Sequence, residues 1–356
     1  MTRALAGNGG GAMMRVALIG LGMVSHIYAD AFANSSTVRL AQVYARNPAS
    51  RADFLARYPK LGASSADSIQ AIAKDPTIDF VILTTPPNAR AEAVAVLARA
   101  GKPILMEKPV ERSLAAARDL VVLCEAAGVP LGIVLQHRAR PVVAELRKHL
   151  PSLGPVLAAE VNVPWWRSQS YYDEPGRGTH ARDGGGVLIS QAIHTLDLML
   201  TLTGAVAEVT AMCATTGLHR MEAEDFVVAG LGFASGAVGQ VFASTASFPG
   251  RGESITLHCR HGSAHLAAGL LKITRHDGSH QSFGQDASSG AGADPMAFSS
   301  DGHRLVIEDF ADALATGRHP LVPGRSALAV HHLIAAIELA GKTGCRQTLG
   351  AMEDVP

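Results

Sequence analysis

The segment Met14-Arg15-Val16-Ala17-Leu18-Ile19-Gly20-Leu21-Gly22-Met23-Val24-Ser25 decides the fold of this chain of 356 residues. Its first half is an apolar run that predicts a buried strand, and its second half is a glycine-rich turn that opens a helix. Gly20 and Gly22 permit a tight turn and let a pyrophosphate approach the backbone N–H groups at the N-terminus of that helix. Ser25 stands where a third glycine or alanine is usual, and its small side chain preserves close packing of helix on strand. The segment predicts a dinucleotide-binding site, with a plain strand-to-helix turn as the alternative.

Strand-like and helix-like segments alternate after this turn. Apolar runs predict strands at residues 15–19, 38–44, 79–83, 104–106 and 131–135. Stretches bounded by caps, glycines and prolines predict helices at residues 24–33, from Pro48 onward, from a cap at Asp67 to Ile72, and at 88–99 and 113–127. This alternation means a mostly parallel sheet covered by helices on both faces. We therefore expect an α/β Rossmann domain that binds NAD(P) over residues 13–136, after a disordered lead of residues 1–12.

The pattern changes after about His137. Alternating stretches separated by glycine and aspartate turns predict antiparallel strands at residues 157–163, 207–213, 226–233, 237–243, 254–259 and 270–275. Helices are expected at residues 187–202, 305–315 and 331–340, and the serine- and glycine-rich segment 285–302 is expected to be a mobile loop. These elements predict a C-terminal α+β domain over residues 137–356.

Composition excludes several classes of protein. The 31 lysine and arginine residues balance 31 aspartate and glutamate residues, so the chain lacks the positive charge of a nucleic-acid binder. A hydrophobic content of 47% is too high for disorder, and no uncharged apolar run reaches the ~18 residues of a membrane span. The four cysteines show no Cys-x-x-Cys spacing. We expect a soluble, cytoplasmic protein with no metal, no membrane association and no nucleic-acid partner.

The end of the second predicted strand bears on the choice of cofactor. NAD sites place a carboxylate there for the ribose 2′-hydroxyl, whereas NADP sites need a cation for the 2′-phosphate. This chain has Tyr44-Ala45-Arg46-Asn47, with no carboxylate, and Arg46 can stack on adenine or pair with phosphate. The turn favours NADP over NAD, with a solvated arginine at a helix entry as the alternative.

Several motifs together resemble one family. After the glycine turn come TTPPN at residues 84–88, EKP at 107–109 and GGGVLISQAIHTLD at 184–197, followed by Glu224-Asp225 and Glu308-Asp309-Phe310. In this order and spacing they resemble the Gfo/Idh/MocA oxidoreductases, the family of glucose-fructose oxidoreductase and inositol dehydrogenase. The similarity extends from Met14 to Leu349.

The resemblance implies a Rossmann domain followed by an α+β domain with a large, mostly antiparallel open sheet that often mediates contacts in a homodimer or homotetramer. It implies hydride transfer between nicotinamide C4 and a carbon that bears a hydroxyl, usually on a sugar or cyclic polyol. Lys108 would hydrogen-bond the reacting oxygen and stabilise alkoxide charge, and His194 would be the general base or acid. The implied cofactor-binding residues are Gly20, Gly22, Met23, Val24, Ala45, Arg46, Thr85, Pro86, Asn88, Glu107 and Lys108.

Structural roles are the alternatives for these residues. A lysine before proline is usually on the surface, and a histidine on an apolar helix is usually a core residue. Asp197, three residues after His194, can orient the imidazole, act as a structural cap or form an ion pair. Many family members carry an aspartate where this chain has Ser190, and a neutral hydroxyl cannot raise the basicity of the histidine as a carboxylate does. This departure argues against the inositol dehydrogenase pattern and favours a sugar-nucleotide branch.

The substrate is suggested by the stretch from Pro164 to Asp173, which holds both tryptophans of the chain. Aromatic rings can stack on a substrate ring, and arginines can bind a carboxylate or phosphate, although an oligomer interface is the alternative. The predicted substrate-binding residues are Trp166, Arg167, Tyr172, Arg177, Ser190 and Gln191. The stretch is similar to the branch that oxidises UDP-N-acetyl-hexosaminuronic acids, from which His180-Ala181-Arg182 departs.

Three other functions remain open from the sequence. One is a cis-dihydrodiol dehydrogenase of an aromatic acid such as a dihydroxyphthalate, which would use the same arginines. Another is a non-catalytic nucleotide-sensing protein, against which the presence of both Lys108 and His194 argues. The third is a hydro-lyase or glycosidase that uses tightly held NAD for a transient oxidation.

Overall fold

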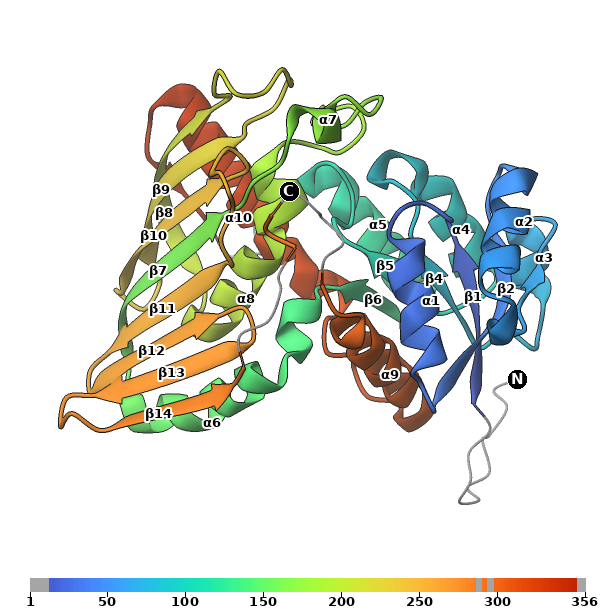
Figure 1. Cartoon of the computed structure of the whole chain (residues 1–356), viewed down its shortest axis with the longest axis horizontal. Coiled ribbons are helices and arrows are strands. Elements are labelled where there is room, and N and C mark those ends of the chain that lie inside the picture. The colour runs from blue at the N-terminus through green and yellow to red at the C-terminus, as the bar shows by residue number, and fades with distance from the viewer. Residues whose placement is uncertain (1–12, 286–289, 293–297, 351–356) are drawn as a thin grey trace. The chain divides into compact units, whose positions relative to one another are not determined.

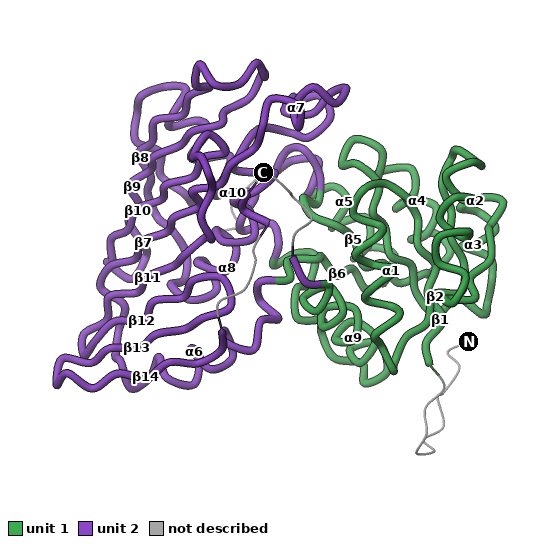
Figure 2. Tube along the Cα trace, viewed as in Figure 1, with its two compact units in different colours: residues 1–110, 118–136, 300–326 green, residues 111–117, 137–299, 327–356 purple. Residues whose placement is uncertain are grey.

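The computed structural model describes residues 13–285, 290–292 and 298–350, and the chain forms two compact units (Figure 2). Unit 1 takes in the chain up to Val110 together with residues 118–136 and 300–326, and unit 2 takes in residues 111–117, 137–299 and 327 onward. The predicted lead of residues 1–12 lies outside the described residues, as do residues 286–289 and 293–297 of the predicted loop. Residues 300–326 fall in unit 1, whereas the sequence pattern places them in the second domain.

Unit 1 is built on a six-stranded parallel sheet with the strand order β3-β2-β1-β4-β5-β6 (Figure 1). Its strands are β1 (Met14–Ile19), β2 (Val38–Tyr44), β3 (Ser64–Ser65), β4 (Phe80–Leu83), β5 (Ile104–Glu107) and β6 (Leu131–Val134). All four residues of β4, β5 and β6 are buried, as expected for strands covered on both faces. The strand order reverses between β1 and β4, which is where open α/β sheets bind ligands at the carboxyl ends of their strands.

Helices cover this sheet, and their bounds are α1 (Ser25–Ala33), α2 (Pro48–Arg57), α3 (Ile69–Lys74), α4 (Ala91–Arg99), α5 (Leu114–Ala126) and α9 (Asp301–Thr316), with short 3-10 turns η1 (Pro59–Leu61), η2 (Pro87–Ala89) and η3 (Gln136–Ala139). α9 belongs to unit 1 because the ring of Phe310 packs edge-on against Phe80 of β4, with ring centroids 5.2 Å apart. Its Glu308 also accepts a hydrogen bond from the hydroxyl of Ser35 at 2.8 Å. These contacts explain why the predicted boundary at residue 136 does not describe the whole of unit 1.

Two predicted helix starts in unit 1 differ from the structure. α3 is capped by Ser68, whose hydroxyl accepts the N–H of Ala71 at 3.0 Å, and not by Asp67. α4 begins at Ala91 and not at residue 88, because Pro87–Ala89 forms a separate 3-10 turn. The second difference turns the side chain of Arg90 into the interior, where it is 2% exposed.

Unit 2 is built on a nine-stranded sheet with the order β14-β13-β12-β11-β7-β10-β9-β8-β15, in which only β7 and β10 pair in parallel. Its strands are β7 (Val156–Pro164), β8 (Val206–Ala214), β9 (Phe226–Phe233), β10 (Val238–Ser244), β11 (Ser254–Cys259), β12 (Gly262–Ala267), β13 (Leu270–Arg275), β14 (His280–Gly284) and β15 (Gln347–Thr348). The predicted fold class, a Rossmann domain plus an α+β domain with a large, mostly antiparallel sheet, is confirmed.

Helices lie on one face of this sheet (Figure 1). They are α6 (Pro141–Leu153), α7 (Gln169–Tyr172), the π-helical turn η4 (Leu188–Ala192), α8 (Ile193–Thr203) and α10 (Gly324–Thr343). α10 packs closely on β8, since a Cβ added at Gly341 would lie 2.5 Å from the Cys213 Sγ. On the other face Met212, Val228 and Val238 are 57%, 40% and 60% exposed, so this face of the sheet carries uncovered apolar side chains.

The predicted helix over residues 187–202 is interrupted. η4 precedes α8 because the chain at Gly186 approaches the loop before β9, where a Cβ would lie 1.8 Å from the Glu224 carbonyl oxygen. The Glu224 carboxylate also accepts the N–H groups of Gly186 and Leu188, at 3.1 Å each. Only glycine fits this contact, and it places the widened helical turn at Ser190 and Gln191.

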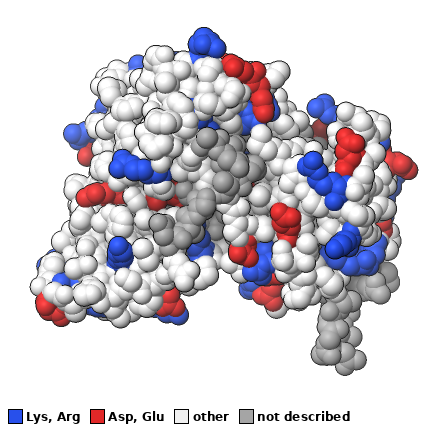
Figure 3. All heavy atoms as spheres, viewed as in Figure 1, with Lys and Arg blue, Asp and Glu red and all other residues white. Residues whose placement is uncertain are grey.

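Charged side chains of both signs are interspersed on the face of the molecule seen in Figure 3. This agrees with the balanced count of 31 positive and 31 negative residues. Among the described residues, no helix is long and apolar enough to cross a membrane.

Candidate active site

The glycine turn after β1 forms a cradle in unit 1. Gly20 has φ +101°, and a Cβ there would lie 2.8 Å from the backbone nitrogen of Thr85 and 2.9 Å from the Thr84 hydroxyl. Thr84 in turn donates a hydrogen bond to the Gly20 carbonyl at 2.6 Å. The turns after β1 and β4 are therefore in direct contact, and only a glycine permits this approach.

The N-terminus of α1 follows this cradle. Its first residue, Ser25, is fully buried, and its hydroxyl bonds the Gly22 carbonyl at 2.6 Å. No side chain caps the helix, and Gly22 and Met23 are exposed. Uncapped N–H groups at a helix N-terminus bind anions well, so these residues fit the pyrophosphate of a dinucleotide. The small Ser25 preserves the packing of helix on strand.

Ala45 and Arg46 occupy the turn between β2 and α2. Arg46 is exposed and makes no hydrogen bond or ion pair with another described residue. Nearby Arg51 is engaged, because it donates to the Ala66 carbonyl at 2.8 Å and lies over the ring of Tyr44. Of these two arginines, Arg46 is the one whose guanidinium is available to a ligand.

Arg90 ties two parts of the predicted cofactor site together, and sequence reasoning missed it. Its guanidinium donates to the carbonyls of Thr85 at 2.9 Å and Glu107 at 2.5 Å, and also bonds that of Pro109. Thr85, with its neighbours Pro86 and Asn88, is thereby linked to the EKP segment. Arg90 stands three residues after the second proline of the TTPPN motif, and no motif marks it.

Glu107 is the buried centre of the EKP segment. Its carboxylate accepts the Tyr28 hydroxyl at 2.7 Å and the Lys108 N–H at 3.1 Å, and His303 Nε2 lies 3.4 Å away. Burial acts to raise the pKa of Glu107, but the bonds and charges of His303, Lys108 and Tyr28 outweigh it and hold the pKa below its usual value. Glu107 is thus an anion that lies next to the half-buried Lys108.

The predicted cofactor residues gather at one edge of unit 1. They follow β1, β2, β4 and β5, whose carboxyl ends share that edge because the strands are parallel. Tyr28 and His303, which hold Glu107, come from α1 and α9 and belong to no motif, so no sequence pattern singles them out.

His194 lies in the first turn of α8 in unit 2, where it is 7% exposed. Its ring lies beside that of His137, with centroids 5.1 Å apart. Asp197 does not orient it, because its carboxylate pairs with Arg138 at 2.7 Å. Of the three roles that the sequence allows for Asp197, the structure shows the ion pair.

The aromatic stretch after β7 gathers two arginines around one tyrosine. The guanidinium carbons of Arg167 and Arg177 lie 5.5 Å and 4.2 Å from the ring centroid of Tyr171, and Arg167 also lies over Trp165 at 5.2 Å. Gln191 of η4 reaches the Tyr171 hydroxyl at 3.4 Å. Arg167, Arg177 and Gln191 are therefore brought together around Tyr171, a residue that sequence reasoning did not select.

The two arginines differ in their partners. Arg177 is held by Glu174, whose carboxylate it meets at 3.0 Å. Arg167 is 3% exposed and donates to the carbonyls of Trp166 and Gly292, while its Nε is buried without a hydrogen-bond partner. Burial is the main cause that lowers the pKa of Arg167, and the positive charge of nearby Arg177 acts in the same direction. Within the described part of the chain, no carboxylate pairs with Arg167.

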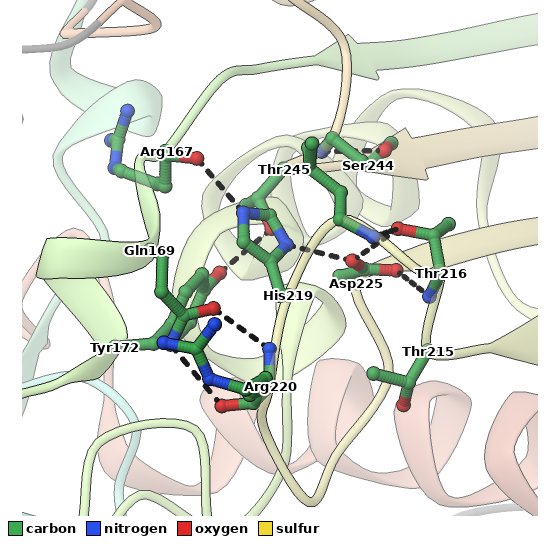
Figure 4. Close-up of polar contacts among 12 residues, drawn as sticks. Arg167, Gln169, Tyr172, Thr215, Thr216, His219, Arg220, Asp225, Ser244 and Thr245 are labelled. Atoms are coloured by element: carbon green, nitrogen blue, oxygen red, sulfur yellow. Dashed lines mark hydrogen bonds and ion pairs between the residues drawn. The ribbon is translucent and has the colours of Figure 1, made fainter.

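In the same stretch Trp166 is half-buried and Tyr172 is buried. The Tyr172 hydroxyl bonds the Thr245 hydroxyl at 2.7 Å, and its ring packs edge-on against His219 (Figure 4). Trp166 packs against Phe248 with centroids 5.2 Å apart. Ser190 is partly exposed on η4, one residue before Gln191.

A cavity of about 380 Å³ lies elsewhere in unit 2. It is lined by residues that include Glu111, Arg112, His180, His331 and Glu338, and by none of the predicted catalytic or substrate-binding residues. Burial, together with the nearby Glu224 carboxyl, raises the pKa of Glu338 to about 8. In the described part of the chain, no cluster of three or more histidine, cysteine, aspartate or glutamate residues has the geometry of a metal site.

Comparison with known proteins matches both halves of the chain to family models. Residues 14–134 match an oxidoreductase family with an NAD-binding Rossmann fold, and residues 149–265 match the GFO/IDH/MocA C-terminal domain. Together these matches cover most of the two units.

Individual relatives are more distant. The 1,5-anhydro-D-fructose reductase of Ensifer adhaerens is 32% identical over 187 residues, which are 49% of this chain and 53% of that protein. The 1-carboxy-3-chloro-3,4-dihydroxycyclo hexa-1,5-diene dehydrogenase of Comamonas testosteroni is 26% identical over 204 residues, 56% of this chain and 50% of that one. The chain thus spans about half the length of these curated relatives.

A solved structure matches over nearly the whole chain. The WlbA dehydrogenase of Bordetella pertussis, in complex with NADH and UDP-GlcNAcA, superposes with a TM-score of 0.80 and 26% identity, covering 95% of this chain and 98% of that one.

Proposed function

Because the chain belongs to the Gfo/Idh/MocA oxidoreductase family, we propose that it is an NAD(P)-dependent dehydrogenase or reductase. Its substrate would be a secondary alcohol or ketone of a carboxylated sugar or cyclic polyol. Unit 1 fits the cofactor, since the cradle at Gly20 has no room for a side chain and the N-terminus of α1 is uncapped. When bound there, the nicotinamide supplies or accepts the hydride.

Lys108 and His194 are proposed as the catalytic residues. Lys108 follows the buried anion Glu107, which favours the charged ammonium, and an ammonium can hydrogen-bond the reacting oxygen and stabilise alkoxide charge. The imidazole of His194 takes the hydroxyl proton in oxidation and returns it in reduction, since histidine is the side chain best suited to general acid and base work near neutral pH. The side chains of Ser190 and Gln191, in the turn just before it, would contact the substrate.

The buried guanidinium of Arg167 is the observation that carries the substrate class. A buried cation with carbonyl and aromatic partners but no carboxylate among the described residues is suited to receive an anionic ligand. Arg177 adds a second positive charge across Tyr171, and we assign to Tyr171 the stacking role that the sequence pattern gives to Trp166 and Tyr172. The presence of a uronic acid nucleotide in the Bordetella structure supports this class, although no separate feature of this chain indicates a UDP site.

A dihydrodiol of an aromatic acid is the second candidate substrate. The Comamonas relative is named for such a carboxylated ring diol, and its carboxylate would use the same arginine. Both candidate substrates have a ring, adjacent hydroxyls and a carboxylate, and Arg167 would bind the carboxylate of either. They differ in the planarity and size of the ring.

NADP is proposed as the preferred cofactor. The turn after β2 offers the exposed Arg46 and no carboxylate, which suits a 2′-phosphate better than a 2′-hydroxyl. The Bordetella relative was solved with NADH, so titration with both reduced cofactors has to decide.

A homodimer or homotetramer is proposed to form through the uncovered face of the nine-stranded sheet. Met212 and Val228 are directly paired across β8 and β9, and Val238 lies farther along β10 on the same face, so this face carries exposed apolar side chains of the kind found in subunit interfaces. Sedimentation of the wild type and of Met212→Lys measures this, and an unchanged oligomer would contradict the assignment.

The reaction is tested by absorbance at 340 nm with uronic acids, UDP-uronic acids and dihydrodiols of aromatic acids. Lys108→Ala and His194→Ala should each lower kcat by at least about 100-fold while NADPH binding stays within threefold. Turnover retained by both variants would refute the mechanism. Cofactor binding without turnover of any substrate in the wild type would favour the nucleotide-sensing alternative, and cofactor retained through purification would favour the transient-oxidation one.

A further inference from the structure

A buried histidine–aspartate pair lies behind Arg167 in unit 2. His219 Nδ1 lies 2.7 Å from the Asp225 carboxylate, and its Nε2 lies 2.8 Å from the backbone carbonyl of Arg167 (Figure 4). Both side chains are fully buried. His219 comes from the loop between β8 and β9, so this pair joins that loop to the aromatic stretch after β7.

The pair is fully engaged in hydrogen-bond contacts. Nδ1 and Nε2 of His219 each face an oxygen that accepts hydrogen bonds, one of the Asp225 carboxylate and one of the Arg167 backbone. The remaining capacity of that carboxylate is used by Thr216, whose N–H and hydroxyl each donate at 2.7 Å. A buried polar network whose donors and acceptors are all satisfied is a rigid unit in a dry interior.

This unit holds the backbone of Arg167 from two sides. The Arg167 carbonyl accepts the His219 Nε2 proton, and the Arg167 N–H donates to the Thr245 carbonyl at 2.9 Å. Thr245 in turn donates its own N–H to the Asp225 carbonyl at 2.9 Å. Both anchors of residue 167 therefore lead back to Asp225, which fixes the point from which the guanidinium side chain departs.

The aromatic neighbours are held by the same unit. The ring of Tyr172 packs against His219 with centroids 4.8 Å apart, and Trp166 lies on another side at 6.2 Å. Trp166 and Tyr172 thus pack on the imidazole of His219. The side chains of Arg167 and Tyr171, which lie between them in sequence, do not pack on this ring.

We propose that His219 and Asp225 are positioning residues that pre-organise Arg167 to bind the carboxylate of the substrate, an inference that rests on the proposed function. Neither residue touches the substrate. Their effect is on the affinity for an anionic group, because a guanidinium whose backbone is fixed loses less freedom on binding than one on a mobile loop. Affinity for uncharged ligands and for the cofactor does not depend on them.

The chain carries its own reporter for this site. Its only two tryptophans are Trp165, under the Arg167 guanidinium, and Trp166, beside His219. Tryptophan emission therefore comes from this stretch alone. The probe is D-glucuronate, with D-glucose as the uncharged counterpart, titrated into the full chain without cofactor.

Four variants separate the possible roles. Arg167→Gln removes the proposed anion partner, His219→Gln removes the double anchor, and Thr216→Val weakens the support of Asp225 without leaving a buried charge. His258→Gln is the matched control, since His258 is an exposed histidine of β11 paired with Glu160. We expect saturable emission change with glucuronate, affinity lowered at least about 10-fold by Arg167→Gln and His219→Gln and about threefold by Thr216→Val, and no change with His258→Gln.

The outcomes are distinguishable. Absence of saturation in the wild type, or wild-type affinity in Arg167→Gln, would overturn the proposed substrate class and this inference with it. Weakened binding in Arg167→Gln with wild-type affinity in both His219→Gln and Thr216→Val would overturn the inference alone. If His219→Gln fails to fold, Thr216→Val decides. With a turned-over substrate, His219→Gln should raise KM for the acid and leave kcat within twofold, whereas a merely structural loss would lower both kcat and NADPH binding.

Discussion

Glu338 should make the stability of the protein fall as the pH rises, and the substitution Glu338→Gln should remove this effect. Glu338 lies on α10 beside Gly185, and its Oε1 is buried without a hydrogen-bond partner. Burial and the Glu224 carboxyl raise its pKa from 4.5 to about 8. The folded state therefore keeps a proton that the unfolded chain releases, so the contribution is fully present below pH 4.5 and is lost as the pH rises to about 8.

The magnitude follows from that interval. One pKa unit corresponds to about 1.4 kcal/mol, so the interval from 4.5 to about 8 gives a ceiling of about 5 kcal/mol. Because Glu338 is partly exposed and its titration is coupled to that of Glu224, we expect its pH-dependent contribution to the free energy of unfolding to be about 2 kcal/mol. A glutamine has the shape of the protonated carboxyl, so Glu338→Gln should match the wild type at pH 5 and be more stable by this amount at pH 8.

Urea denaturation at pH 5, 6, 7 and 8 measures the difference. Glu222→Gln is the control, because Glu222 is an exposed carboxyl of the same unit and should show no difference that grows with pH. A gap between Glu338→Gln and the wild type that stays constant or shrinks from pH 5 to pH 8 would refute the argument.

The remaining predictions concern single contacts. Gly186→Ala should lower the unfolding free energy by at least about 3 kcal/mol in urea denaturation, because its Cβ would meet the Glu224 carbonyl at 1.8 Å, whereas Gly217→Ala, with open space around it, should be neutral. Arg46→Asp should weaken NADPH binding at least about 10-fold in fluorescence titration and leave NADH binding unchanged or tighter; equal loss for both would contradict a 2′-phosphate contact. Tyr28→Phe should cost about 1–3 kcal/mol by removing a hydrogen bond to buried Glu107, with the loss present above pH 4.5 and fading below it; a loss that does not depend on pH would rule out that partner. Arg167→Met should raise the thermal midpoint while lowering affinity for D-glucuronate, and a lower midpoint would show that the guanidinium stabilises the fold.

Buried strands were the most predictable part of the fold. β2, β9, β11 and β13 have the predicted bounds, because strands covered by other elements read as continuous or strictly alternating apolar runs. β12, with the sequence GSAHLA, was not predicted, since small and polar residues give no strand signal. Its pairing with β11 and β13 supplies the stability that its own residues do not.

Helix α6 and the turn η4 were missed for different reasons. α6 contains Pro151, which reads as a break, although the proline falls near the end of the helix where few hydrogen bonds are lost. η4 depends on the close approach of Gly186 to Glu224, two residues that are far apart in the sequence. A contact of this kind is invisible to any local pattern.

Motif residues of the site were predictable because they follow strands whose carboxyl ends share one sheet edge. The residues that hold them were not. Tyr28 and His303 reach Glu107 from two separate helices, and His219 reaches Arg167 from a loop 52 residues away. Each supports a motif residue through one side-chain contact, and the partner of such a contact is set by the tertiary fold and not by spacing along the chain.

The buried charges of unit 2 distinguish stabilising residues from functional ones. Asp197 pairs with Arg138 and Glu253 with Arg140, so each of these carboxylates has a cation that offsets its loss of water, and Asp225 is held by His219 and Thr216. Arg167 is buried to a similar degree, yet its partners are two carbonyl oxygens and aromatic rings. Two carbonyl dipoles do not replace a full negative charge in a medium of low dielectric constant, and the lowered pKa of Arg167 reflects that cost. A ligand carboxylate that binds there forms an ion pair with Arg167. The free energy of that ion pair, which the folded protein alone does not have, then contributes to the binding affinity. The same reasoning explains why the anchoring of Arg167 is so complete, because an unpaired cation on a loose loop would turn toward water, and only a backbone fixed through His219 and Thr245 keeps it in the interior.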